Sequence, residues 1–244
     1  MLNTITLYSD GPVDTDTCHK ISDIKSALHN KDRVNVFVDE KFFCSLDISQ
    51  VVDLKIKIGR ILTADELVEL KRASDFSKFY AQALAYTLLR PHSEKELRDY
   101  LRRKTLKRLV RVKNHRTNEY QTKEKPGYDV SLVEPVFTRL KDRGYLDDRR
   151  FAELWVENRN TAKGMSLKKL NMELRQKGIS QSIINDVLGD SERNDRAELH
   201  KIILRKRTKY PDSEKFAQYL MRQGFNYSDV LDELSLAEDS SLGA

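Results

Sequence analysis

The chain has 244 residues, of which 39% are hydrophobic and 34% are charged, with a formal net charge of +6 at pH 7. This length is enough to bury one large core or two ordinary ones without disulfides or metal ions. No run approaches the roughly 18 uninterrupted apolar residues that a membrane span requires, and the N-terminus has no charged-then-apolar leader, so we expect a cytoplasmic protein. Cys18 and Cys44 lie far apart, which indicates neither a disulfide framework nor a zinc site.

The first 62 residues predict a small β-rich domain. Hydrophobic residues mark a strand at residues 5–7 and a hairpin with strands at 34–38 and 42–46. Apolar and polar residues alternate over 52–58, which predicts a further strand with one buried face. Between the first strand and the hairpin, the spacing of apolar residues over 18–28 favours one helix, so we expect a small sheet with a helix on it.

From residue 63 to the end, the pattern is helical. Thr63-Ala-Asp-Glu66 has the sequence of a capping box, and Ser93-Glu-Lys-Glu96 and Ser131-Leu-Val-Glu134 repeat it. Each box precedes apolar residues at steps of three and four, which is the spacing of one helical face. Pro135 falls in the first turn of its helix, where a missing N–H costs little.

The helical part also repeats itself. Leu174-Arg-Gln-Lys-Gly178 returns as Leu220-Met-Arg-Gln-Gly224, an offset of 46 residues, and we expect each glycine to end its helix. Leu97 and Leu101 correspond to Leu170 and Leu174 in an earlier copy, where a basic insertion replaces the glycine. Periods of 40 to 50 residues in helical sequence are typical of stacked units, because one short unit hides its apolar face poorly alone.

The predicted fold is therefore mainly α: tandem three-helix repeats that form an elongated curved array, preceded by the small β-rich domain. The predicted boundaries are 1–62 for the β-rich domain, 63–148 for repeat 1 with its basic insertion at about 105–128, 149–190 for repeat 2, and 191–244 for repeat 3 with an acidic tail. Such an array offers a long concave surface and no deep pocket, which suits binding a filament or strand better than catalysis.

Motifs that carry chemistry are missing from the sequence. The five histidines show no convergent spacing, and there is no H-E-x-x-H, P-loop, G-x-G-x-x-G or G-x-S-x-G sequence. We therefore predict a binding protein that is not an enzyme and that needs no metal or cofactor.

Positive charge is concentrated in one part of the chain. Residues 75–244 hold 34 basic and 26 acidic side chains, a net of +8, and residues 98–125 alone hold 11 basic and 3 acidic ones. A concentrated basic stretch is the footprint expected for contact with phosphates or an acidic partner. If the basic residues of the repeats lie along one side, they track a phosphate backbone; if not, they only form solvated faces.

The candidate binding residues lie mainly on the predicted second helix of each repeat, and in repeat 3 at the end of the first helix. Those of repeat 1 recur at steps of three and four opposite Leu97 and Leu101, which predicts one basic helical face. The candidates are Arg98, Arg102, Arg103, Lys104, Lys107, Arg108, Arg111, Lys163, Lys168, Lys169, Arg175, Lys177, Arg205, Lys206, Arg207 and Lys209.

Aromatic side chains are the residues that stack on bases in single-strand binding proteins. Phe151 and Trp155 lie four apart on one helical face, so we assign both to the core. Tyr145 follows Gly144 in a predicted turn, and its placement stays open.

Gly144-Tyr-Leu-Asp-Asp-Arg-Arg-Phe-Ala152, then Lys163-Gly164, then Leu174-Arg-Gln-Lys-Gly-Ile179, resembles the signature of the RecX family. Together with Ser93-x-x-Glu-Leu97, the pattern covers most of residues 76–234. The same residues make sense as local structure, because Gly144 can release the chain from one helix and Asp147 or Asp148 can cap the next.

The resemblance implies a bacterial modulator of the RecA recombinase, a protein of three-helix repeats that lies in the groove of the RecA–DNA filament. It implies a negative regulator that limits filament growth, ATP hydrolysis, strand exchange and co-protease activity, with consequences for DNA repair and the SOS response. Two features depart from the family pattern: the basic insertion, and the strand-rich leader, which the shortest members lack. We expect a monomer whose contact with single- or double-stranded DNA is weak and directed to the backbone.

Two other functions remain open at this stage. The basic helices of residues 98–125 favour a DNA-binding regulator that acts directly, with helix pairs used as in a helix-turn-helix. A protein-only adaptor is the third hypothesis, with the acidic tail at 229–239 as either a contact or a solvated end.

Overall fold

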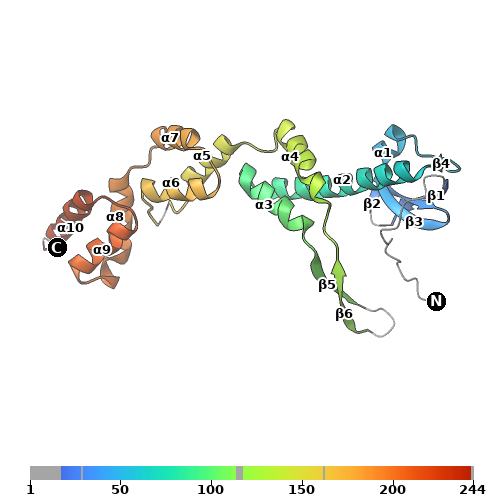
Figure 1. Ribbon diagram of the computed structural model, residues 1–244. Helices are drawn as coiled ribbons and strands as arrows, with labels where there is room; N and C mark the ends of the chain where they lie inside the picture. Colours follow the sequence, from blue (N-terminus) through green and yellow to red (C-terminus); the bar gives the residue numbers. More distant parts are fainter. Residues whose placement is uncertain (1–17, 29, 114–117, 162, 243–244) are drawn as a thin grey trace. The chain divides into compact units, whose positions relative to one another are not determined.

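The computed structural model describes residues 18–28, 30–113, 118–161 and 163–242, with the side chains of 237–242 excepted (Figure 1). The strand predicted at residues 5–7 lies outside this described part. The chain divides into two compact units, residues 1–82 and 83–244, and the division falls within helix α2 (Ala64–Leu89). Among the described residues, no helix combines the length and the apolarity that crossing a lipid bilayer requires.

The first unit contains a four-stranded antiparallel sheet in the order β3-β2-β1-β4. Its strands are β1 (His19–Ala27), β2 (Asn30–Val38), β3 (Lys41–Asp47) and β4 (Ile61–Leu62). The predicted hairpin is confirmed as β2 and β3, which turn at Asp39 and Glu40 with positive φ angles of 48° and 64°. Buried Ile21, Val36 and Leu46 form one core with Leu70 of α2, so this helix packs against the sheet.

Two predictions for this unit are wrong. Residues 18–28 form strand β1 and not a helix: Ile21 is buried in the sheet core, whereas Leu28 is 90% exposed. The alternating run at 52–58 is not a strand but the end of helix α1 (Ile48–Asp53) and a turn, in which Ile56 is buried while Val52 and Ile58 are exposed. The spacing of apolar residues in both segments is compatible with a helix and with a strand. Pairing with β2 makes residues 19–27 a strand.

The second unit contains three successive groups of helices, as predicted. After α2 come α3 (Glu94–Thr105) and α4 (Val133–Asp142); then α5 (Asp148–Asn158), α6 (Leu167–Gln176) and α7 (Gln181–Gly189); and then α8 (Asp195–Lys206), α9 (Ser213–Arg222) and α10 (Tyr227–Leu242). Short 3₁₀ turns, η1 (Val130–Leu132) and η2 (Arg207–Lys209), precede α4 and follow α8. We refer to α3, α6 and α9 as the second helices. The prediction of a mainly helical chain of three-helix repeats behind a small sheet is confirmed.

The repeated glycines end their helices as predicted. Gly178 follows α6 with φ +85°, and Gly224 follows α9 with φ +94°, a backbone conformation that favours glycine. The apolar residues that the repeat aligns, Leu97, Leu170 and Phe216, are all fully buried. The aligned position is therefore a core position in all three second helices.

Of the three predicted capping boxes, only the first forms in full. The Thr63 amide donates to the Glu66 carboxylate at 2.8 Å, and the Glu66 amide donates to the Thr63 hydroxyl at 3.2 Å. Ser93 accepts from the Glu96 amide, but the Glu96 carboxylate binds other side chains. Ser131 is not a cap, because α4 begins two residues later and Asp129 caps the preceding 3₁₀ turn. Pro135 does lie in the first turn of α4.

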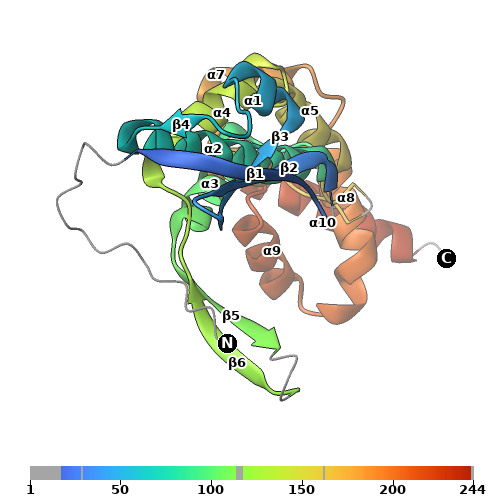
Figure 2. The same cartoon turned by 90° about the vertical axis from the view of Figure 1, so that its right-hand side faces the viewer.

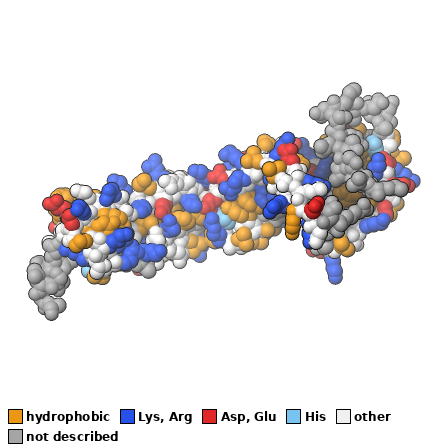
Figure 3. Space-filling view, turned by 90° about the horizontal axis from the view of Figure 1, so that it is seen from below, with side chains coloured by type: hydrophobic (Ala, Val, Ile, Leu, Met, Phe, Trp, Pro, Cys, Tyr) orange, Lys and Arg blue, Asp and Glu red, His pale blue; other side chains and the backbone are white. Residues whose placement is uncertain are grey.

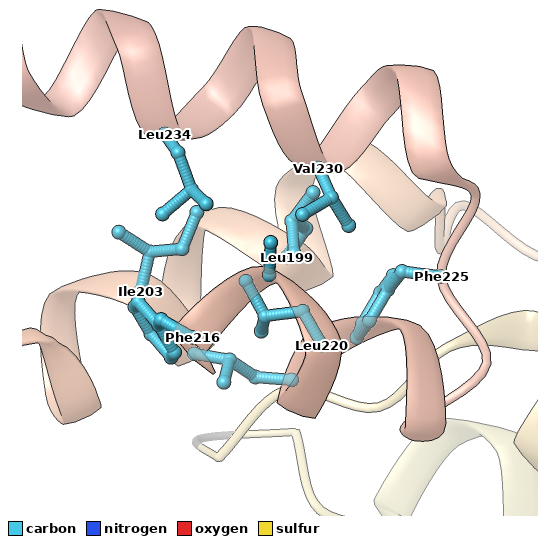
Figure 4. Close-up of a cluster of buried hydrophobic side chains, with 9 residues drawn as sticks. Leu199, Ile203, Phe216, Leu220, Phe225, Val230 and Leu234 are labelled. Carbon is cyan, nitrogen blue, oxygen red and sulfur yellow. The ribbon is translucent and has the colours of Figure 1, made fainter. Parts of the chain in front are cut away.

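Each later repeat has its own core. In repeat 3, nine buried residues from α8, α9, α10 and the loop before α10 meet, and Figure 4 shows Phe216 and Leu220 of α9 facing Ile203 of α8 and Leu234 of α10. In repeat 2, Phe151, Leu174 and Ile184 belong to a separate cluster of buried residues. Core formation within each group is what the repeat period predicts.

The basic insertion in repeat 1 is a β-hairpin. Strands β5 (Arg108–Lys113) and β6 (Tyr120–Lys125) pair antiparallel, with Arg108 opposite Lys125 and Lys113 opposite Tyr120. Placing Lys107, Arg108 and Arg111 on the basic face of the second helix is therefore wrong, because α3 ends at Thr105. β-branched Val110 and Val112 between basic residues give the alternation of a strand, a signal that the helical spacing of the charges obscured.

Candidate binding surface

Two equivalent joints connect the repeats through their second helices. At the first joint, the hydroxyl of Ser93, the N-cap of α3, donates to the carbonyl of Lys177, the C-cap of α6, at 2.7 Å. The side chain of Asp148, the first residue of α5, accepts from the Glu94 amide at 2.9 Å. The N-terminus of α3 thus meets the C-terminus of α6.

The second joint uses the same residue types at the equivalent positions. The hydroxyl of Ser166, the N-cap of α6, donates to the carbonyl of Gln223, the C-cap of α9, at 2.6 Å. Asp195, the first residue of α8, accepts from the Leu167 amide at 2.7 Å. In both joints a positive helix N-terminus faces a negative C-terminus, which is favourable, and unpaired backbone groups gain partners.

The helix-ending glycines are also the points of closest approach at these joints. A Cβ on Gly178 would lie 2.7 Å from the Cβ of Lys95, and a Cβ on Gly224 would lie 2.8 Å from the Ser166 hydroxyl oxygen. Glycine is therefore needed here both for the left-handed turn and for contact with the preceding repeat. Two repeats joined in the same way are related by a similar displacement, so equivalent surface positions follow a regular path.

Electrostatics support the equivalence of the joints. Burial raises the pKa of Asp148 and of Asp195, and in each case the hydrogen bond from a helix amide offsets part of the increase. Glu96 at the first joint behaves differently: burial alone would raise its pKa, but hydrogen bonds from Arg90, Lys177 and His92 lower it to about 2. The first joint thus carries a permanent negative charge that binds Lys177 of the neighbouring repeat.

Several exposed cations on the second helices are not engaged by other side chains in the described part of the chain. The structure gives their side chains no ion pair and no hydrogen bond to any described residue. They are Arg102 and Arg103 of α3, Lys168 and Arg175 of α6, and Arg222 of α9, which we call the second-helix cations. Arg102 and Arg175 occupy the same position in two repeats, as do Arg103 and Arg222. Figure 3 shows Lys and Arg side chains set among hydrophobic ones on one face of the molecule.

Other predicted binding residues are already engaged within the chain. Arg98 pairs with Glu134 at 2.6 Å, and its guanidinium lies 3.5 Å from the centre of the Phe137 ring. Lys177 binds Glu96 at 2.6 Å. A charge that is matched inside the fold has less to gain from an external phosphate, because binding would first break the internal contact.

Four more of the predicted binding residues also contact other side chains within the fold. The Lys169 ammonium donates to the Gln223 side chain at 2.7 Å, and the Lys206 ammonium donates to the Tyr219 hydroxyl at 2.6 Å. Arg207 donates to Ser213 at 3.2 Å, and the Lys104 ammonium lies 5.1 Å from the centre of the Tyr100 ring. By contrast, Lys163, Arg205 and Lys209 are exposed, the first in the turn between α5 and α6 and the others at the end of α8 and in η2.

Aromatic residues are mostly structural. Phe151 is buried as predicted, but Trp155 is only half-buried: its indole N–H donates to Glu173 at 3.1 Å, and Arg159 and Lys177 lie over its ring. Trp155 packs against the core of repeat 2 without being fully buried, so the prediction of a core Trp155 is confirmed only in part. Tyr145 is 39% exposed after Gly144.

Sequence reasoning did not identify the residues that form the joints, nor Arg222. The signal was present, because Ser93 and Ser166 stand in the same position of two repeats, as do Asp148 and Asp195. Asp147 was considered as the cap of α5 and does accept from the Arg150 amide at 2.9 Å. Asp148, the other candidate for that cap, instead caps the helix of the neighbouring repeat.

Comparison with known proteins identifies both parts of the chain. Residues 19–63 match the family model described as the regulatory protein RecX N-terminal domain, and residues 147–188 match the one described as RecX, second three-helix domain. The regulatory protein RecX of Bacillus licheniformis is 28% identical over 218 residues, with 86% of this chain and 74% of that protein covered. That of Listeria monocytogenes serotype 4b is 30% identical, with 74% of this chain but only 58% of that protein covered.

Further relatives extend the match. The regulatory protein RecX of Clostridium perfringens is 27% identical, with 85% of this chain and 91% of that protein covered. A solved structure of regulatory protein RecX has the same fold with a TM-score of 0.63 at 22% identity, covering 86% of this chain and 96% of the other. RecX from Lactobacillus salivarius gives a TM-score of 0.50 at 20% identity, covering 68% and 98%. With both family models, these relatives and this fold in agreement, the chain belongs to the RecX family of regulatory proteins.

Proposed function

We propose that this chain binds the RecA–DNA filament and limits its growth, and thereby its ATP hydrolysis, strand exchange and co-protease activity. Membership of a family of regulatory proteins named RecX supports a regulatory role with RecA as the partner. The observation that carries the proposal is the set of second-helix cations, four of which occupy equivalent positions of repeats that two equivalent joints connect.

The charges available to an external phosphate are those that no group inside the fold already pairs with. Cations without internal partners gain the most when they neutralise phosphates, because counterions are released and no internal pair is broken. The second-helix cations meet this condition, whereas Arg98 and Lys177 do not. A filament repeats its structure at regular intervals. Unpaired cations that are themselves regularly spaced are therefore suited to bind it.

In this proposal the protein acts as a monomer in the cytoplasm and has no catalytic step and no cofactor. Its contact with single- or double-stranded DNA is weak and directed to the backbone. The repeats act as separate modules with the boundaries 63–148, 149–190 and 191–244, and the sheet at 1–62 precedes them.

ATP hydrolysis by RecA on single-stranded DNA tests the proposal. The wild-type chain should inhibit hydrolysis at or below a one-to-one ratio to RecA. Charge reversal at four second-helix cations (Arg102→Glu, Arg103→Glu, Lys168→Glu and Arg175→Glu) should raise the concentration needed for half inhibition by about tenfold or more, because phosphate contacts act through charge.

A matched control reverses the same number of charges in the first unit, at four of its exposed lysines. They are Lys20, Lys31, Lys41 and Lys57. Reversing these four should leave inhibition close to wild type. An equal loss in both variants would mean that net charge, and not the second helices, is responsible, and wild-type protein that never slows hydrolysis would refute the proposal itself.

A further inference from the structure

The basic hairpin, residues 107–125, is an insertion whose two ends lie close together beside the end of α3. The Tyr128 amide donates to the Lys104 carbonyl at 3.0 Å, which closes the base of the insertion. Gly127 lies directly against Thr105: a Cβ there would be 2.1 Å from the Thr105 carbonyl oxygen, so only glycine fits. Figures 1 and 2 both show the two strands extending away from α3 and α4.

The register of the hairpin sorts its side chains onto two faces, because paired residues share a face and neighbours along a strand alternate. One face, which we call the open face, carries Arg108, Val110, Val112, Gln121, Lys123 and Lys125. The other, which we call the paired face, carries Leu109, Arg111, Lys113, Tyr120, Thr122 and Glu124.

The two faces differ in how their charges are matched. On the paired face, Lys107 next to β5 lies 3.5 Å from the Glu124 carboxylate, and the Arg111 guanidinium lies 5.9 Å from the centre of the Tyr120 ring. The open face has no acidic residue among those described, and the structure gives no ion pair or hydrogen bond to the side chains of its three cations. All three are exposed: Arg108, Lys123 and Lys125.

The spacing of these cations suits a phosphate backbone. Arg108 and Lys125 are directly opposite each other, with Cβ atoms about 5 Å apart, and Lys123 lies two residues along the strand, about 7 Å further. Duplex DNA carries one negative charge for about every 1.7 Å of its axis, so several phosphates come within reach of such a group.

We infer that the open face of the basic hairpin binds the backbone of duplex DNA. This deepens the proposed function by assigning its contact with double-stranded DNA to one surface, whereas the binding of RecA rests on the second helices. A two-stranded ribbon has the width to enter the major groove. The open face carries no aromatic ring on which unpaired bases would stack, and the one tyrosine of the strands lies on the paired face with Arg111, which favours a duplex over a single strand.

Binding to a labelled duplex of about 30 base pairs, without RecA, tests the inference through its salt dependence. The open-face variant combines Arg108→Gln, Lys123→Gln and Lys125→Gln. Three lost backbone contacts should make the slope of log affinity against log salt less steep by about 2.7, and weaken binding about tenfold or more near 0.1 M salt. The full chain is used, and because the hairpin side chains are exposed, the thermal unfolding midpoint should stay unchanged.

A paired-face variant with Lys107→Gln, Arg111→Gln and Lys113→Gln removes the same three charges and serves as the control. Its slope should change by less than about 1. Equal effects of the two variants, or no effect of the open-face variant, would overturn the inference. So would a loss of binding to an oligothymidylate of the same length with duplex binding retained. Since RecA is absent from this experiment, its failure would leave the RecA proposal untouched.

Discussion

Replacing Gly164 with alanine should destabilise the second unit by about 2–5 kcal/mol, since two costs add. Gly164 has φ +76°, a conformation that costs an L-residue roughly 1–2 kcal/mol. A Cβ there would lie 2.4 Å from the Glu198 carbonyl oxygen and 2.7 Å from Cγ1 of Ile202 on α8, and overpacking of this kind costs typically 1–3 kcal/mol. The glycine of the Lys163-Gly164 motif is thus the place where repeat 2 approaches repeat 3.

Urea unfolding followed by circular dichroism measures this loss. Gly189→Ala is the matched control, because Gly189 ends α7 with no atom within 4 Å of the added Cβ and no left-handed φ. That variant should be neutral or up to about 1 kcal/mol more stable. Equal stability of the two variants would show that the contact with α8 does not constrain residue 164.

Glu198→Gln should cost about 3 kcal/mol, because it leaves a buried cation without its counter-ion. The Glu198 side chain is 2% exposed and pairs with Arg193, itself 11% exposed, at 2.7 Å. It also accepts from the Met165 amide at 2.9 Å and from Lys201 at 2.8 Å. Arg193 donates in turn to the Val156 carbonyl at the end of α5, so the pair ties repeat 3 to repeat 2.

The Glu198 carboxylate should also make the stability of the fold depend on pH, with a loss of stability in acid. Burial alone would raise the pKa of Glu198, but hydrogen bonds from Arg193, Lys201 and the Met165 amide lower it below the ordinary value of 4.5. A lowered pKa means that the unfolded chain binds the proton more tightly. The contribution is therefore fully present above about pH 4.5 and is lost as the pH falls through the folded-state pKa.

Free energies of unfolding at pH 7 and at several values below pH 4.5 check both statements. The glutamine variant should be less stable at pH 7 and should lose less stability than wild type on acidification. Glu153→Gln is the control, since Glu153 forms exposed pairs with Arg149 and Arg150 that are worth at most about 1 kcal/mol. A glutamine variant as acid-sensitive as wild type would contradict the assignment.

The helical repeats could be predicted because their signals are local and redundant. Leu170 and Phe216 follow the period of a helix, and Gly178 and Gly224 end two helices at the same offset. One helical pattern or one glycine predicts little alone, but its recurrence in a second repeat supports the same structure in both. The turn glycines needed no knowledge of the tertiary structure, since a left-handed residue after a helix is a local requirement.

The sheet was harder to predict because partners far along the chain decide it. Ile21 and Ile24 have helical spacing, yet they pair with Val38 and Val36 as strand residues. Apolar Val52 alternates with polar neighbours, yet it lies exposed on a helix. Short segments with mixed periodicity take whichever structure their neighbours stabilise.

For the candidate binding residues, the sequence located the charges but not their partners. Arg98 and Arg102 look alike on one helix, yet only Arg98 meets Glu134, from a helix that begins 28 residues after α3 ends. Lys177 differs from Arg175 because Glu96 of the preceding repeat binds it. Which cations remain available depends on contacts between helices that are distant in sequence, and no local pattern specifies these contacts.

The N-cap of α9 differs from those of α3 and α6 in the hydrogen bonds that it can make. The hydroxyl groups of Ser93 and Ser166 each accept a hydrogen bond from an amide of their own helix and donate one to a carbonyl of the following repeat. The corresponding residue of α9 is Asp212, whose carboxylate accepts from Glu214 and Lys215 and has no proton to give. A grafted fourth module would find no donor there, so Asp212→Ser is the first change required to lengthen this protein by design.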